Sequence, residues 1–111
     1  MTQVERIGEI VSLYRRHGWR LERLLLRPAT SAELTAAPGE LTEGASVQEA
    51  AFDALWFARP SHAGREAWEL RLVAETPYAL FESFEQDEAE EDREDVRREM
   101  EARLADYAAR D

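Results

Sequence analysis

The chain has 111 residues with no cysteine, and its 24 acidic residues against 14 basic ones give a formal net charge of −10 at pH 7. We expect residues 1–111 to form a single domain with one hydrophobic core, because this length is typical of one domain. Without cysteine there is no disulfide framework, no thiol nucleophile and no cysteine-bound zinc. The negative charge argues against nucleic acid and anionic membranes as partners, since both require a basic surface.

The start of the chain and its apolar runs predict a cytoplasmic protein that does not enter a membrane. Met1 leads into the polar segment Thr2–Glu5 rather than into a basic and then apolar signal sequence. No apolar run approaches the roughly 18 residues that a membrane-spanning helix requires. We therefore expect no membrane association.

Residues 3–17 are predicted to form an amphipathic helix. Thr2 and Glu5 have the spacing of a capping box, in which each side chain bonds to the backbone N–H of the other residue. Apolar residues then recur every three or four positions, as on one face of a helix: Val4, Ile7, Val11 and Tyr14. Gly18 follows at the position where a left-handed residue commonly ends a helix.

Residues 19–27 predict a strand added at an edge of the sheet. Trp19 and Leu21 alternate with polar residues, but the alternation fails at Leu24-Leu25-Leu26. Either a bulge switches the faces of the strand there, or both faces are covered at that end.

Two connecting segments follow this strand. Residues 28–46 are small and polar and are interrupted by Pro38-Gly39, which predicts a long surface connection with one helical turn at 32–36. The sequence Ser46-Val-Gln-Glu49 has the spacing of a second capping box, so a short helix is predicted to begin there.

The centre of the chain predicts a hairpin of two strands. Residues 52–59 are rich in aromatics and are closed by Pro60, which favours a strand. Residues 67–75 alternate between apolar and charged side chains, the pattern of a half-buried strand. The turn-like segment 61–64 between them favours antiparallel pairing.

The stretch from Ala67 to Glu85 predicts a second hairpin that turns at Thr76-Pro77. Its register gives one apolar face and one charge-paired face, with Leu72 opposite Phe81, Ala74 opposite Ala79, and Arg71 opposite Glu82. Proline suits a two-residue hairpin turn poorly. The alternative is that Thr76-Pro77 begins a helix over residues 78–84.

A long C-terminal helix is predicted over residues 87–111. Its apolar stripe steps by four, four and three residues: Val96, Met100, Leu104 and Tyr107. Acid-first pairs four residues apart support it: Glu94–Arg98, Glu99–Arg103 and Asp106–Arg110.

Together these elements predict an α+β fold in the order α-β-loop-β-β-β-α. An antiparallel sheet of three or four strands is expected to be packed on one side by an N-terminal helix and a C-terminal helix. Side chains of residues 52–57 that do not face this core must then be covered by something else. We therefore expect a homodimer in which Trp56 and Phe57 contact a partner.

The turn between the central strands is the segment most typical of a ligand site. Arginines on both sides of it and backbone N–H groups within it could hold a phosphate or a carboxylate. It lacks the spacing of a phosphate-binding loop, and hairpin loops commonly contain these residue types. The predicted ligand-binding residues, beside an aromatic pocket, are Arg59, Ser61, His62 and Arg65.

The acidic block from Glu85 to Glu101 predicts a contact surface for a basic protein. The block lacks the spaced acids and the glycine of a calcium loop, so no metal site is predicted. The alternative is a solvated face near a helix start. The predicted partner-binding acids are Glu90, Glu91, Glu94 and Asp95.

Arginines near the N-terminus form an exception to the acidic balance, and we expect them to meet an acid-rich helix of the same chain or of a second copy. These residues are Arg15, Arg16, Arg20, Arg23 and Arg27.

No pattern pairs a nucleophile with a base or sets two carboxylates across a cleft, so no catalytic residue and no cofactor are predicted. The main hypothesis is a small acidic interaction domain that self-associates and binds a basic partner. The alternative is a domain that binds a small anionic molecule near the Ser61–Arg65 turn.

Overall fold

The computed structural model describes residues 1–36 and 42–110. The elements in chain order are α1 (Gln3–Arg16), β1 (Arg20–Leu26), α2 (Pro28–Ala36), β2 (Ser46–Glu49), β3 (Ala54–Pro60), the 3-10 turn η1 (His62–Gly64), β4 (Glu66–Leu72), β5 (Tyr78–Phe84) and α3 (Glu90–Ala109). The strands form one sheet of order β2-β1-β3-β4-β5. The predicted α+β class is confirmed, but the sheet has five strands and is mixed, because β1 and β2 run parallel.

Helix α1 forms as its sequence predicts. The Glu5 backbone N–H donates to Thr2 Oγ1 at 3.1 Å, and the Thr2 N–H donates to Glu5 Oε1 at 3.0 Å, so the capping box is present. Gly18, at φ +83°, follows the helix in the left-handed conformation that favours glycine. The buried face consists of Ile7, Ile10, Val11 and Tyr14.

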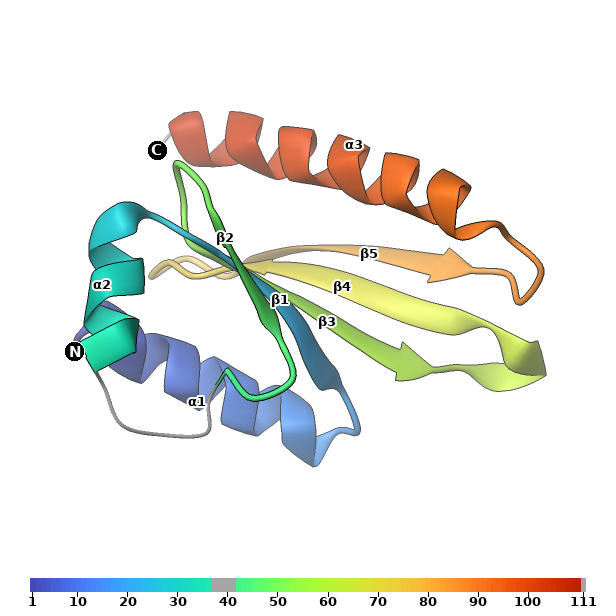
Figure 1. Cartoon of the computed structure of the whole chain (residues 1–111), viewed down its shortest axis with the longest axis horizontal. Helices are drawn as coiled ribbons and strands as arrows, with labels where there is room; N and C mark the ends of the chain where they lie inside the picture. The colour runs from blue at the N-terminus through green and yellow to red at the C-terminus, as the bar shows by residue number, and fades with distance from the viewer. Residues whose placement is uncertain (37–41, 111) are drawn as a thin grey trace.

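The two long helices cover opposite faces of the sheet, with α1 on one side and α3 on the other (Figure 1). The prediction that both pack on one side is wrong. Its consequence for the partner surface is also wrong, because α3 covers Trp56 and α1 covers Phe57. Both side chains are 0% exposed, so neither can contact a second protein in this fold.

Strand β1 lies inside the sheet, between β2 and β3, and not at an edge as predicted. Its register against β3 shifts between Leu21 and Arg23, which places a bulge at Glu22. Leu24 and Leu26 then pack under α1 while Leu25 packs under α3. The failed alternation therefore reflects a strand that is covered on both faces.

The segment between β1 and β3 contains more structure than predicted. Residues 28–36 form the nine-residue helix α2, which begins at a proline, the residue favoured at a first helical position. Residues 46–49 are a strand and not the predicted helix, because they pair with β1 in register, Leu24 beside Val47. The predicted Pro38-Gly39 break lies outside the described residues.

The second hairpin is confirmed, and residues 78–84 are strand rather than helix. Its predicted register is wrong: Leu72 pairs with Tyr78, and the facing residues are three positions from the expected ones. The backbone N–H of Val73 donates to Asp53 O at 2.9 Å, so Val73 lies in the loop and not in the ladder. The odd-numbered shift turns Phe81 away from the α3 face and leaves it 59% exposed.

Helix α3 begins at Glu90, three residues later than predicted, and buries Met100 and Leu104 from the expected stripe. The predicted partner of Glu94 was Arg98, but Glu94 instead accepts from Arg23 at 2.8 Å and from Arg97 at 2.9 Å. The first half of the helix is therefore attached to the sheet by charged groups.

Candidate functional site

The predicted anion-binding turn does not bring its arginines together. The Arg59 guanidinium lies 4.4 Å from the centre of the Trp19 ring and donates to the His17 carbonyl at 2.7 Å. Arg65 instead forms an ion pair with Glu85 beyond β5. Ser61 closes the turn through its backbone N–H and His62 is exposed. Of the four predicted ligand residues, only Arg59 lines a cavity described below.

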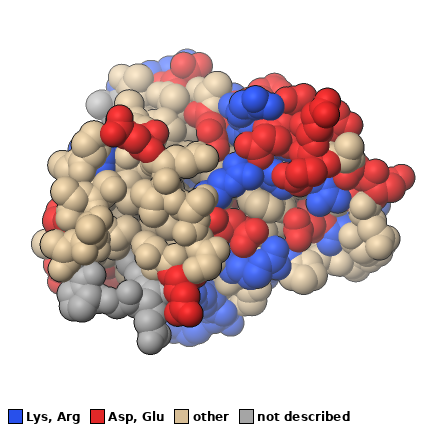
Figure 2. All heavy atoms as spheres, in the orientation of Figure 1, with Lys and Arg blue, Asp and Glu red and all other residues tan. Residues whose placement is uncertain are grey.

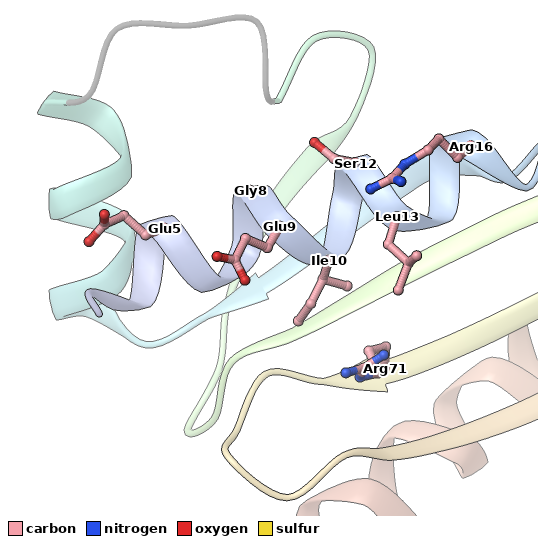
Figure 3. Close-up of a pocket in the computed structure, with 8 residues that line it drawn as sticks. All are labelled: Glu5, Gly8, Glu9, Ile10, Ser12, Leu13, Arg16 and Arg71. Atoms are coloured by element: carbon pink, nitrogen blue, oxygen red, sulfur yellow. The ribbon is translucent and has the colours of Figure 1, made fainter.

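A cleft of about 380 Å³ opens where the end of α1 meets the sheet. It continues into a shallow groove of about 830 Å³ along the exposed side of α1, and Leu13 and Arg71 line both (Figure 3). Figure 3 shows Leu13 on α1 directed toward the strand that carries Arg71. The other residues of the cleft are Tyr14, His17, Trp19, Arg59 and Glu69.

A hydrogen-bonded cluster forms one wall of this cleft. The Tyr14 hydroxyl bonds to the Glu69 carboxylate and accepts from Arg71 Nη1 at 3.5 Å, while its ring stacks on Phe57 at 4.1 Å. Burial, together with the bond to Glu69, raises the pKa of Tyr14, so its hydroxyl stays protonated at neutral pH. Among the residues that the structure describes, Arg71 Nε is buried without a hydrogen-bond partner. Glu69 and Arg71 were identifiable in advance as same-face neighbours on β4, but Tyr14 was not expected to join them.

The acids predicted to contact a partner differ in their contacts within the chain. Glu90 and Glu94 are engaged within the chain, because both accept hydrogen bonds from Arg97, at 2.7 Å and 2.9 Å. Hydrogen bonds from Arg23 and Arg97 lower the pKa of Glu94 to about 2. Glu91 and Asp95 are exposed, and Asp95 pairs with the exposed Arg98 at 2.6 Å. Figure 2 shows acidic side chains gathered over this half of α3 among a few arginines.

Arg97 is the residue of this region that sequence reasoning missed. It is 1% exposed, and its guanidinium lies 3.8 Å from the centre of the Trp68 ring and 5.3 Å from that of Phe84. The available signal was its spacing, because positions 97, 100 and 104 fall on one helical face. An arginine within such a stripe is amphipathic enough to be buried when its charged end finds carboxylates.

Of the N-terminal arginines expected to meet an acid-rich helix, only Arg23 does so within the described residues. Arg23 pairs with Glu94 as described, and Arg27 Nη2 lies 3.1 Å from the buried carboxylate of Asp53. Arg20 pairs with Glu66 at 3.2 Å. The Arg23 pair therefore joins the sheet to α3, whereas the Arg20 pair joins two strands of the sheet.

Neither the described residues nor the comparisons with known proteins identify a metal site, a membrane-spanning helix or a related protein. Within residues 1–36 and 42–110, no group of three or more histidine, aspartate or glutamate side chains could hold a metal ion. In the same part of the chain no helix is long and apolar enough to cross a membrane. Comparisons with protein-family models, curated proteins and solved structures find no match to this chain.

Proposed function

We propose that the protein is an acidic interaction domain that binds a basic partner protein through the outward surface of the first half of α3. The observation that supports this is the division of the acids on that helix. The buried Arg97 bonds to Glu90 and Glu94, and Arg23 bonds to Glu94. Asp87, just before the helix, and Glu91 and Asp95 on it are exposed, and Asp95 pairs with the equally exposed Arg98 at 2.6 Å. We call these three exposed acids the outward acidic surface.

The attachment of α3 gives the outward acidic surface a fixed geometry. The Arg97 guanidinium is held by two carboxylates and by the Trp68 ring, so the helix turn that carries Glu91 and Asp95 is anchored from below. Preorganised groups lose less conformational entropy on binding than groups on a mobile segment. A partner therefore meets acids already in place.

The charge of the whole molecule favours the same class of partner. A net charge of −10 creates a negative field that speeds the approach of a cationic protein and repels an anionic one. The field increases the rate at which the two proteins meet, and the outward acidic surface then provides the contacts of the bound complex. Binding is therefore expected to weaken as salt is added.

The test compares two triple variants in affinity capture from a cell extract. Asp87→Asn, Glu91→Gln and Asp95→Asn remove the outward acidic surface, and the control removes three exposed acids elsewhere: Glu33→Gln, Glu43→Gln and Glu49→Gln. Each triple changes the net charge from −10 to −7, since three acids become neutral.

The unmodified protein and the control are expected to capture one basic protein in a stoichiometric amount. The first triple should weaken this complex by about tenfold, because contact charges contribute more than distant ones. Equal capture by both triples would contradict the assigned surface. Recovery of no basic protein above background would contradict the function itself.

A second candidate function rests on the cleft beside α1. Arg59 over Trp19, together with the unpartnered Nε of Arg71, provides cationic groups against aromatic walls, which suits a small anionic molecule. A thermal-shift screen of anionic metabolites tests it, since a true ligand at 100 times its Kd stabilises by about 2.7 kcal/mol. The shift should disappear in Arg71→Gln, and a screen without any shift contradicts this candidate.

A further inference from the structure

We propose that the protein forms a two-fold symmetric dimer in which the β5 strands of two copies pair antiparallel and join the two sheets into one. The surface differs from the outward acidic surface, so the inference goes beyond the proposed function. It follows from an open strand edge, an exposed phenylalanine at the middle of that edge, and a self-complementary row of charges on α3.

The two edges of the sheet differ in their protection against pairing. Strand β2 has four residues, and a short strand limits edge-to-edge association. Strand β5 has seven residues without proline, pairs with β4 without a bulge, and carries one charge, Glu82. Beyond the ladder with β4, no hydrogen bond from the rest of the described chain reaches the β5 backbone. This edge therefore presents backbone donors and acceptors to a further strand.

Phe81 is the middle residue of β5 and is 59% exposed. A two-fold axis at Phe81 places this ring beside its own copy and sets Ala79 opposite the partner's Ser83, so small residues flank the two rings. Aromatic pairs across strands are stabilising, and the pairing removes apolar surface from water. The same register sets Glu82 opposite the partner's Leu80, so the single charge of the strand does not face its own copy.

Helix α3 runs antiparallel to β5 on the covered face of the sheet. Tyr107, near its end, stacks on Tyr78 at 3.7 Å between ring centres, and Arg97, near its start, lies 5.3 Å from the centre of the Phe84 ring. The midpoint of β5 is therefore level with the part of α3 midway between residues 97 and 107. A two-fold axis through the middle of β5 relates the two copies of α3 about this level.

A row of four exposed charges follows the side of α3 nearest β5. The opposite side faces β3 and β1, because Glu101 bonds to Trp56 at 2.8 Å and Glu94 to Arg23 at 2.8 Å. The row is spaced by seven, four and seven residues, which keeps its members on one side of a helix beside Tyr107. From the start of the helix its members are Asp92, Glu99, Arg103 and Arg110, and the exposed Asp106 lies between the two arginines on the same side.

The order of charges in this row favours a second copy of the chain as the partner at the β5 edge. At the four positions Asp92, Glu99, Arg103 and Arg110 the charges run negative, negative, positive, positive, so an antiparallel neighbour of the same sequence is complementary there. The same register sets Asp106 across from the uncharged Val96 of the second copy. The axis sets Glu99 across from the partner's Arg103 and Asp92 across from the partner's Arg110. A basic protein at this edge would instead meet two arginines.

Sedimentation equilibrium of the protein alone tests the proposal, with the unmodified chain expected to be dimeric. Phe81→Lys should give a monomer, since lysine on an edge strand blocks pairing. Glu99→Arg or Arg103→Glu should each weaken the dimer by about tenfold, because two symmetric attractions become repulsions. The double variant Glu99→Arg with Arg103→Glu should restore the affinity. Arg16→Glu, an exposed change on α1, is the control and should leave the dimer intact.

Thermal unfolding of each variant confirms that the monomer is folded before its mass is interpreted. A monomeric unmodified protein at about 1 mM would overturn the proposal, since even weak specific dimers populate at that concentration. A dimer that is insensitive to Phe81→Lys, or a double variant no better than the single ones, would also overturn it. The proposed function is tested separately, because the dimer variants keep the outward acidic surface and its capture of a basic protein.

Discussion

The two long helices are attached to the same sheet by different chemistry. Helix α1 packs through aliphatic side chains, with Ile7 and Val11 in the cluster that contains Leu24. Helix α3 contributes two fully apolar buried residues, Met100 and Leu104, and the guanidinium of Arg97 completes its contact surface. One layer is therefore stabilised mainly by burial of apolar area, and the other also requires charged groups.

The comparison shows how an acid-rich helix can pack against a sheet. Arg97 covers the Trp68 ring with its flat guanidinium and uses its N–H groups for two carboxylates of its own helix. The carboxylates are thereby held at the surface next to a buried cation. Such an arrangement stabilises α3 and also orients the outward acidic surface that we propose as a binding site.

The largest effect is expected from the aliphatic layer. Ile7→Ala removes a side chain that is 0% exposed and leaves a cavity under α1, so the free energy of unfolding should fall by about 3 kcal/mol. Chemical denaturation measures the change. Leu13→Ala on the same helix is the control, because Leu13 is 44% exposed and its loss should cost under about 0.5 kcal/mol. Similar losses for the two variants would mean that α1 does not pack by this face.

The charged layer should respond to Arg97→Ala with a loss of about 2 kcal/mol. The value is below that for a fully buried ion pair, because the Glu90 side chain is already 68% exposed to water. Arg97→Met keeps the packing on Trp68 and should recover about half of the loss. A loss under about 0.5 kcal/mol for Arg97→Ala would show that α3 does not depend on the charged network.

Acid should weaken the attachment of α3 through Glu94. The folded pKa of Glu94 is about 2, below its ordinary value of 4.5, so its contribution is present above pH 4.5 and is lost as the pH falls toward 2. The side chain is 36% exposed, and solvent screening reduces the expected contribution to about 1 kcal/mol. Glu94→Gln should lose less stability between pH 6 and pH 3 than the unmodified chain. Identical pH profiles would contradict the ion pairs of Glu94.

The smallest effect is expected from the neighbouring arginine. Arg98 pairs with Asp95 at 2.6 Å, but both side chains are about two-thirds exposed. Arg98→Ala should change the free energy of unfolding by under about 0.5 kcal/mol, because exposed ion pairs contribute little. Arg97 and Arg98 carry the same charge, but only Arg97 is buried. The difference between the two losses in free energy of unfolding therefore measures the effect of burial. A loss as large as that of Arg97→Ala would show that the two positions do not differ as the structure indicates.

Elements with a local signal were predictable from the sequence. The capping box at Thr2 and Glu5, the periodic apolar face of α1 and the Gly18 stop specify a helix through neighbouring residues alone. The alternating pattern of β4 and the aromatic content of β5 identified the second hairpin. Its register was not predictable, because a backbone hydrogen bond from Val73 to Asp53, the residue before β3, sets where the ladder ends.

Long-range packing explains what remained beyond sequence reasoning. Residues 46–49 resemble a helix start locally, yet a parallel partner in β1 makes them a strand. Both faces of β3 are buried because α1 and α3 lie on opposite sides of the sheet. The position of α3 is not encoded in residues near β3, so the burial of both Trp56 and Phe57 could not be predicted from the local sequence. The Arg97 network likewise joins residues from α3, β1 and β4 that are far apart in sequence.

The most direct measurement is the salt dependence of affinity between the protein and the basic protein that it captures, determined by isothermal titration. We expect the affinity to fall as ionic strength rises from about 0.05 to about 0.5 M, because salt screens attraction between opposite charges. The slope should be smaller for the triple variant of Asp87, Glu91 and Asp95 than for the control triple. An affinity that does not fall with salt, or equal slopes for the two triples, would contradict the binding surface assigned to α3.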